Sequence, residues 1–305
     1  WLVDPDHPLL ARVTVNRLWQ SLFGVGIVQS PEDLGSQSTR PEHPAVLDLL
    51  AWTFSHPPAD GGLGWDMKRL VKGILLSRTY RQRSMADART MADDPLNAWL
   101  ARGPRHRLPA EMIRDGALAA AGLLVERLGG PPVKPYDVAE SFKPEAADSG
   151  EALYRRSLYT FWRRTGPAPI LETFDVPKRV VCVARRDTTN TPLHAFVLLN
   201  ATQFVEASRT LAETLMAANP ADPAAALAEA FFRLTSRRPD AEETRIIGRM
   251  HDAQLAWYRD HPDEAERLVE VGDRPHAAAL PAVDVAAATA VVNALMNYDG
   301  CVVKR

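Results

Sequence analysis

Apolar residues recur at intervals of three and four through most of this chain, and this spacing limits its fold more than any other feature. One such stretch covers residues 8–23 and ends at Gly24; others follow Pro44, Asp66 and Thr191. Prolines and capping residues at the start of a stretch, and glycine after its end, are typical helix boundaries. Strands do not alternate with these stretches, which argues against a parallel sheet. The pattern predicts a mainly α-helical protein.

Two segments in the middle of the chain have strand composition instead. Residues 153–165 are rich in Tyr, Phe, Trp and Thr, and residues 179–185 contain three valines. We expect them to form a small antiparallel β ribbon. The stretch before them packs four prolines and three glycines into residues 129–150, which is typical of a long loop. We therefore expect an N-terminal helical lobe over residues 1–130, a loop over 131–152 and a C-terminal lobe over 153–305, all within one family unit.

Overall charge and hydropathy exclude several classes of protein. The 305 residues include 36 Lys and Arg against 38 Asp and Glu, a net charge of −2, so we expect no general nucleic-acid binding. The hydrophobic fraction of 46% is that of a globular protein rather than a disordered one. The most apolar stretch, residues 277–296, carries Pro281 and Asp284, and we expect no membrane span. The chain opens on Trp1 without signal-peptide features, and we interpret it as part of a longer protein.

Cysteine and histidine usage gives no sign of a cofactor in this chain. Cys182 and Cys301 are the only cysteines, too few for a four-thiol zinc site, and neither belongs to a haem-attachment motif. We expect them to be two buried thiols that are not bonded to each other, and a single disulfide in an exported protein is the alternative. The eight histidines lack metal-ligand spacing, so we expect no metal site. Phosphate-binding loops, nucleophile elbows and zinc-protease motifs are also absent.

Positive charge is concentrated between residues 151 and 190. This segment contains seven arginines and one lysine but only four acidic residues. Basic and aromatic side chains interleave there, as they do on surfaces that bind sugars or single-stranded nucleic acid. The candidate ligand-binding residues in this part are Arg155, Arg156, Trp162, Arg163 and Arg164. The alternative interpretation is that these arginines bind carboxylates and carbonyls of their own chain.

A second group of candidates lies just before the helix that we expect to start at Pro192. It consists of Arg185, Arg186, Thr188, Asn190 and Thr191. Guanidinium groups beside a helix N-terminus suit an anion, and we expect both groups to share one electropositive concavity. A well-capped helix start, with Thr191 as the cap, is the alternative.

Several longer strings resemble the cytochrome-associated PSD domain of planctomycete bacteria, a domain of unknown function. They are Ala11-Arg12-Val13-Thr14-Val15-Asn16-Arg17-Leu18-Trp19-Gln20, Gly64-Trp65-Asp66-Met67-Lys68-Arg69-Leu70, Ser77-Arg78-Thr79-Tyr80-Arg81-Gln82 and Arg185-Arg186-Asp187-Thr188-Thr189-Asn190-Thr191-Pro192-Leu193-His194-Ala195. His194 stands where such sequences commonly have Gln, so it is given no family role. The resemblance implies an extracytoplasmic location and an upstream domain, often a c-type cytochrome that would hold any haem c. It supplies no catalytic residues.

These observations together favour an accessory or ligand-binding module of an extracytoplasmic protein linked to a c-type cytochrome. Its expected partners are the upstream domains of the same polypeptide and an anionic or carbohydrate ligand. An enzyme that acts on polysaccharide or another polymer through an arginine-rich cleft is the alternative. A deep pocket with two carboxylates converging beside Arg163 or Arg186 would favour the enzyme.

Overall fold

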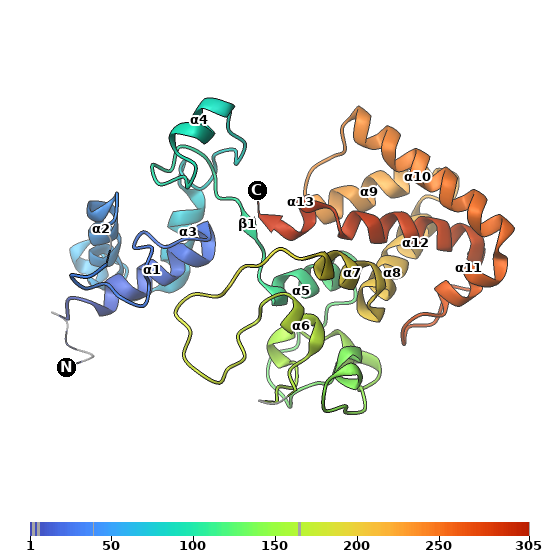
Figure 1. Ribbon diagram of the computed structural model, residues 1–305, viewed down its shortest axis with the longest axis horizontal. Helices are drawn as coiled ribbons and strands as arrows, with labels where there is room; N and C mark the ends of the chain where they lie inside the picture. The colour runs from blue at the N-terminus through green and yellow to red at the C-terminus, as the bar shows by residue number, and fades with distance from the viewer. Residues whose placement is uncertain (2–3, 5–6, 39, 164–165, 305) are drawn as a thin grey trace. The chain divides into compact units, whose positions relative to one another are not determined.

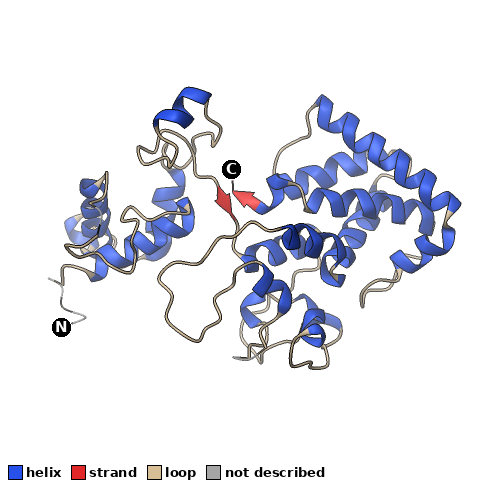
Figure 2. Cartoon of the chain, viewed as in Figure 1, coloured by secondary structure: helices blue, strands red, loops and turns tan. Residues whose placement is uncertain are grey.

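Helices dominate the computed structural model, which describes residues 1–305 apart from residues 2–3, 5–6, 39, 164–165 and 305 (Figure 1). Within the described residues, strands are confined to one short antiparallel pair (Figure 2). The predicted class, mainly α-helical with a small antiparallel ribbon, is confirmed. No helix in the described part of the chain is both long and apolar enough to cross a membrane.

The chain divides into two compact units. Unit 1 holds residues 1–107 and the end of the chain from residue 303, and unit 2 holds residues 108–302. This division comes earlier than the expected lobe boundary at residue 130. The reason is helix α5 (Ala110–Ala120), whose Ile113 and Leu118 belong to the apolar core of unit 2.

Unit 1 is a group of short helices around one apolar core. Its helical elements are α1 (Leu10–Phe23), α2 (Pro44–Ser55), η1 (Pro58–Asp60), α3 (Met67–Leu76) and α4 (Ala88–Asp93). The core side chains are Val15, Trp19, Phe23, Leu47, Phe54, Leu70 and Ile74. Helix α3 starts after Asp66, as expected, because the Asp66 carboxylate accepts a hydrogen bond from the Arg69 amide at 3.0 Å. The unit also contains strand β1 (His106–Arg107), which pairs with β2 (Val303–Lys304).

Unit 2 is built around α8 (Thr202–Ala218) and α12 (Ala282–Met296). Helix α12 has ten buried residues and is apolar around its circumference, as expected of a helix covered on all sides (Figure 1). Its neighbours include α8, α9, α10 and α11. The remaining helical elements of the unit are η2 (Tyr136–Glu140), η3 (Gly150–Tyr154), η4 (Ser157–Tyr159), α6 (Pro169–Thr173), α7 (Pro192–Asn200), α9 (Pro223–Thr235), α10 (Ala241–Asp260), α11 (Pro262–Val269) and α13 (Asp299–Val302).

The predicted position of the ribbon, in the middle of the chain, is wrong. Within the described part of residues 153–165 there are 3-10 turns and two isolated bridges, Val125 to Arg155 and Val133 to Thr160, and residues 179–185 contain no strand. The aromatic composition of the first segment reflects burial instead, since Leu153 and Tyr154 pack into the core of unit 2. β-propensity reports how well a side chain suits a packed surface and does not by itself require a strand.

Helix α7 begins at Pro192, as predicted, but Thr191 is not its side-chain cap. Thr191 occupies the N-cap position with no side-chain hydrogen bond to the helix, so the loss of its hydroxyl has no capping cost. Thr189 instead donates to the Asp175 carboxylate, at 2.9 and 3.0 Å to the two oxygens. The helix ends at Asn200 and a new one, α8, begins after an extended Ala201.

The two cysteines are free thiols, which confirms that they are not bonded to each other. Cys182 is exposed and Cys301 is partly buried, so the expectation of two buried thiols is wrong. The reason for the exposure of Cys182 is its position in the long connection between α6 and α7, which lacks regular structure over residues 179–185.

Arg114 makes four side-chain hydrogen bonds beneath the irregular part of unit 2. It projects from α5, is 2% exposed, and donates to the carbonyls of Leu153 (2.7 Å) and Arg155 (2.9 Å). It also donates to Gln203 Oε1 on α8 at 2.9 Å and to Ser157 Oγ at 3.2 Å. Buried carbonyls outside helices and sheets need partners, and one guanidinium supplies several of them.

Glu206 plays the corresponding role as an acceptor from α8. Its buried carboxylate accepts from the hydroxyls of Tyr154 (2.7 Å) and Tyr136 (3.1 Å) and from the amides of Asp273 (2.9 Å) and Arg274 (2.8 Å). Gly272, with φ of 99°, lets the backbone lie close to Glu206, because a Cβ at this position would be 2.5 Å from the Glu206 carboxyl. Burial raises the pKa of both tyrosines, and the Glu206 carboxylate raises it further.

Replacing Arg114 with methionine should destabilise the protein strongly. The Arg114→Met variant keeps an unbranched apolar side chain but removes the guanidinium and leaves buried carbonyls without donors, which we expect to cost at least about 3 kcal/mol. The matched control is Arg156→Met, because Arg156 is 39% exposed and has one ion pair, with Glu126, that contributes at most about 1 kcal/mol. Urea denaturation of both variants measures the difference. Equal costs would contradict the role assigned to Arg114.

The two tyrosines on Glu206 should make the protein sensitive to alkali. Their pKa values are raised above the ordinary value of 10.0, so their stabilising contribution is complete below pH 10 and is lost as the pH rises beyond it. Above pH 10 the free energy of unfolding should fall less steeply with pH in the Tyr136→Phe/Tyr154→Phe variant than in the unmodified protein. The difference in slope should be up to about 1.4 kcal/mol per pH unit for each tyrosine removed.

Urea denaturation between pH 8 and pH 11 measures this slope. The control is Tyr159→Phe, because the Tyr159 hydroxyl accepts from the Gly129 amide and does not contact Glu206. A slope in the double variant equal to that of the unmodified protein would show that these tyrosines do not govern the alkaline response.

Candidate functional site

Four of the six arginines predicted to bind a ligand have partners within the chain. Arg155 is buried, donates to the carbonyl of Arg127 at 2.8 Å, and stacks on the Tyr159 ring at 3.9 Å. Arg156 pairs with Glu126 at 3.2 Å. Both arginines therefore bind the segment of residues 126–130. These contacts agree with the interpretation that the arginines have partners within their own chain.

The rest of the first group follows the same pattern. Arg163 donates to the carbonyl of Lys143 and pairs with Glu145 at 3.2 Å. Trp162 lies under the Arg179 guanidinium, 4.5 Å from the ring centroid. Arg164 lies outside the described residues. The carboxylate that pairs with Arg163 is Glu145 alone, so the structure does not bring two acids together beside this arginine in the described part of the chain.

The second group lies on the exposed connection that leads to α7. Arg186 is 46% exposed and pairs with Glu111 of α5 at 2.7 Å. Arg185, Thr188 and Asn190 are exposed, and Thr191 is partly buried. Arg186 and the arginines of the first group thus contact different partners. Ligand binding at these residues stays a prediction.

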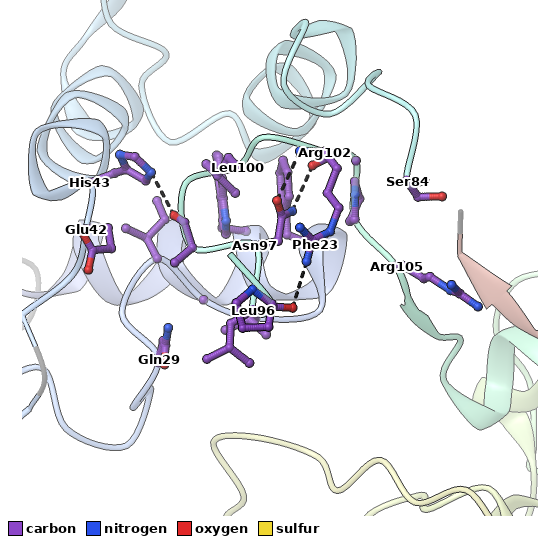
Figure 3. Close-up of a pocket in the computed structure, with 18 of the residues that line it drawn as sticks. Phe23, Gln29, Glu42, His43, Ser84, Leu96, Asn97, Leu100, Arg102 and Arg105 are labelled. Carbon is purple, nitrogen blue, oxygen red and sulfur yellow. Dashed lines mark hydrogen bonds between the residues drawn. The ribbon is translucent and has the colours of Figure 1, made fainter. Parts of the chain in front are cut away.

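A cleft that the sequence did not indicate lies entirely within unit 1. Its volume is about 660 Å³, which is within the range of small-molecule sites (Figure 3). Its walls come from the end of α1 and the loop after it, from residues 40–43 before α2, and from residues 84–105. Among the side chains that line it are Trp19, Phe23, Gln29, Arg40, Glu42, His43, Ser84, Met85, Leu96, Asn97, Leu100, Arg102 and Arg105.

The inner wall of this cleft is rigid and aromatic. Trp19 and Phe23 stack with their ring centroids 4.1 Å apart, and both side chains are also part of the unit 1 core. One helical turn of α1 separates them, so the helix itself fixes their spacing. Asn16, a further turn back, holds the loop after α1, since its side chain exchanges hydrogen bonds of 3.0 and 2.9 Å with the backbone of Val28.

The opposite wall is a loop, residues 94–102, held in a strained conformation. Asn97 and Leu100 have φ angles of 54° and 55°, in the left-handed region that non-glycine residues rarely occupy. Asp94 stabilises this conformation by accepting from the amides of Ala98 (2.7 Å) and Trp99 (3.0 Å). Arg102 donates to the carbonyls of Asp94 and Pro95, both at 2.8 Å.

Further side-chain hydrogen bonds, from within the loop and from elsewhere in unit 1, hold the same loop. Asn97 Nδ2 donates to the carbonyl of Arg102 at 2.9 Å, and His43 Nε2 lies 3.0 Å from the carbonyl of Ala98 (Figure 3). Gln82 Nε2 reaches the carbonyl of Leu100 at 2.9 Å. The loop is therefore tied at several points and presents Leu96 and Leu100 to the cleft in a fixed arrangement.

Four polar side chains of the cleft have no partner among the described residues. Gln29, Arg40, Glu42 and Ser84 make no hydrogen bond or ion pair with the part of the chain that the structure describes. Three of them are drawn around the cavity in Figure 3. They are available to a ligand. The described residues contain no cluster of His, Cys, Asp and Glu that could hold a metal ion.

The sequence did not reveal this cleft because its residues come from separate segments and none belongs to a catalytic motif. One signal was present, however. Met85, Met91 and Leu96 are large apolar residues in a polar stretch without helical periodicity, and all are exposed around the cleft. Apolar residues concentrated in an irregular segment indicate either a local core or a binding surface.

Comparisons with known proteins agree with the resemblance seen in the sequence. Residues 1–251 match the family model PSD1, described as "Protein of unknown function (DUF1553)". Neither curated proteins nor solved structures gave a match. The match covers all of unit 1 up to residue 107, with the cleft, and the larger part of unit 2. Since it extends over well more than half of the sequence, the chain belongs to the PSD1 family.

Proposed function

We propose that this chain is a ligand-binding module and that the cleft of unit 1 is its binding site. The observation that carries the proposal is the strained loop of residues 94–102, which lines the cavity and is held by Asp94, Asn97 and Arg102. A left-handed conformation at a non-glycine residue costs on the order of 1 kcal/mol, and such residues cluster at ligand sites. Two such residues within one loop on the cavity wall, Asn97 and Leu100, support a binding role.

The chemistry of the cleft supports the same proposal. An aromatic wall and exposed apolar side chains supply contact area, while Gln29, Arg40, Glu42 and Ser84 supply polar groups without partners. Ligand sites typically combine mostly apolar walls with a few polar groups that orient the ligand. Binding, rather than a particular reaction, is what this arrangement supports.

The biological setting that we propose rests on the sequence resemblance. Following it, the module serves as an accessory part of an extracytoplasmic protein linked to a c-type cytochrome, with any haem held by an upstream domain. Membership of the PSD1 family agrees with the resemblance on which this setting rests.

Filling the cleft should abolish binding without unfolding the protein. Leu96 is 76% exposed on the cleft wall, so the Leu96→Trp variant adds bulk there at little cost to stability. The matched control is Leu128→Trp, because Leu128 is 80% exposed and lies in unit 2. Saturation-transfer NMR with a library of small soluble compounds measures binding to all three proteins.

We expect compounds that bind the unmodified protein and the Leu128→Trp control to lose their signal with Leu96→Trp. Thermal unfolding of the three proteins, compared in parallel, confirms that the fold is intact. The same compounds binding equally to all three proteins, or no compound binding to the unmodified protein, would contradict the proposal.

A further inference from the structure

One wall of the unit 1 cleft, residues 84–93 with helix α4, is bonded to the rest of the unit only at its ends. The structure describes every one of these residues, and none of them is buried. Within the described part of the chain, their hydrogen bonds and ion pair stay inside the segment or reach the adjoining Asp94. Asp87, for example, accepts from the amides of Thr90 and Met91. Neither a buried side chain nor a polar contact therefore holds the middle of this segment in place.

Both ends of the segment are tied to residues 94–103. At the first end, the Gly103 amide donates to the carbonyl of Arg83 at 2.8 Å. At the other end, the Asp94 carboxylate accepts from two backbone amides of the loop, and the Arg102 guanidinium donates to the carbonyl of Asp94. A segment that is fixed at two points and unattached between them can turn about those points as a unit.

The segment also exposes apolar side chains at the cleft. Met85 and Met91 line the cleft and are 85% and 47% exposed, and Leu96 on the fixed loop is 76% exposed. Covering such side chains with an apolar surface is favourable, because it removes them from water. Methionine suits this purpose since its unbranched, flexible side chain adapts to surfaces of different shape.

We propose that residues 84–93 form a flap that closes over a ligand in the unit 1 cleft, with Met85 and Met91 covering an apolar face of that ligand. This inference rests on the proposed function and adds to it how access to the site is controlled. Residues 94–103 stay in place while the flap moves. The closed position is favoured only with a ligand bound, because the ligand supplies the apolar surface that the two methionines contact.

Amide hydrogen exchange of the intact chain, followed by NMR, tests the mobility of the flap. Without added compound, we expect the Thr90 and Met91 amides to exchange at least about tenfold faster than the Ala98 and Trp99 amides, which are bonded to a buried carboxylate. Equal exchange of the four amides would show that the segment is as firmly held as the loop and would overturn the proposal.

Closure is tested with the library compounds that bind the unmodified protein but not Leu96→Trp. Adding such a compound should slow exchange at Thr90 at least about tenfold and leave exchange at Ala98 unchanged. Thr90 does not line the cleft, so its protection reports the position of the flap rather than direct contact with the compound. The same compound added to Leu96→Trp is the control and should change neither amide. Unchanged exchange at Thr90 in the unmodified protein would overturn the proposal.

Replacing the two methionines tests the apolar contact. The Met85→Gln/Met91→Gln variant keeps the length of both side chains, and we expect the same compounds to bind it about fivefold more weakly and to dissociate correspondingly faster. The matched control is Met67→Gln/Met112→Gln, because both residues are 56% exposed and neither lines the cleft. Thermal unfolding should be the same in both variants. Equal weakening in the two variants, or none in the flap variant, would contradict the role of the methionines.

These outcomes separate failure of the flap from failure of the site. If compounds bind in a way that depends on Leu96 while exchange at Thr90 does not respond, the cleft is a rigid site and the flap alone is overturned. If no compound depends on Leu96, the proposed function fails and this inference fails with it.

Discussion

Arg114 donates hydrogen bonds to backbone carbonyls of a segment that has almost no regular structure of its own. The architecture of unit 2 depends on these bonds. Between α5 and α6 the chain runs for nearly fifty residues with only short 3-10 turns, yet Leu153 and Tyr154 on it are buried. Backbone groups that accompany such side chains into the core lose water and need other partners. Arg114 on α5 and Glu206 on α8 supply donors and acceptors from two regular helices, so rigid elements hold the irregular one.

In unit 1, too, side chains of regular or well-ordered segments bond the backbone of a loop. Asn16 of α1 fixes the backbone of Val28, and Arg102 fixes the carbonyls of Asp94 and Pro95. In both units a polar side chain that is at least nine-tenths buried is bonded to main-chain atoms of a loop. Such a group is costly to bury unless its hydrogen bonds are complete. The loops that Asn16 and Arg102 hold are for this reason fixed in shape, which favours the binding that we propose because less entropy would be lost.

Local features of this fold could be predicted from sequence, and features that depend on distant partners could not. Asp66 begins α3, and Pro192 begins α7, because a cap or a proline acts within one helical turn. The ribbon was misplaced because the aromatic residues near Tyr154 owe their position to burial against α5 and α8, which no local pattern encodes. The excess of arginine near residue 160 was visible in the sequence, but its partners, such as Glu126 and the carbonyl of Arg127, become neighbours only in the folded chain.

The residues that carry the family resemblance acquire a physical meaning from the structure. In the first string, Asn16 holds the loop after α1 and Trp19 forms the inner wall of the cleft. In the third, Gln82 binds the carbonyl of Leu100 on the opposite wall. Two of the four strings thus help to shape the cleft, whereas Gln29, Arg40, Glu42 and Ser84, which also line it, lie outside all four. The residues that shape the cleft are thus separate in the sequence from its polar side chains without partners. If the cleft binds a ligand as we propose, the same loops can hold different polar groups toward different ligands.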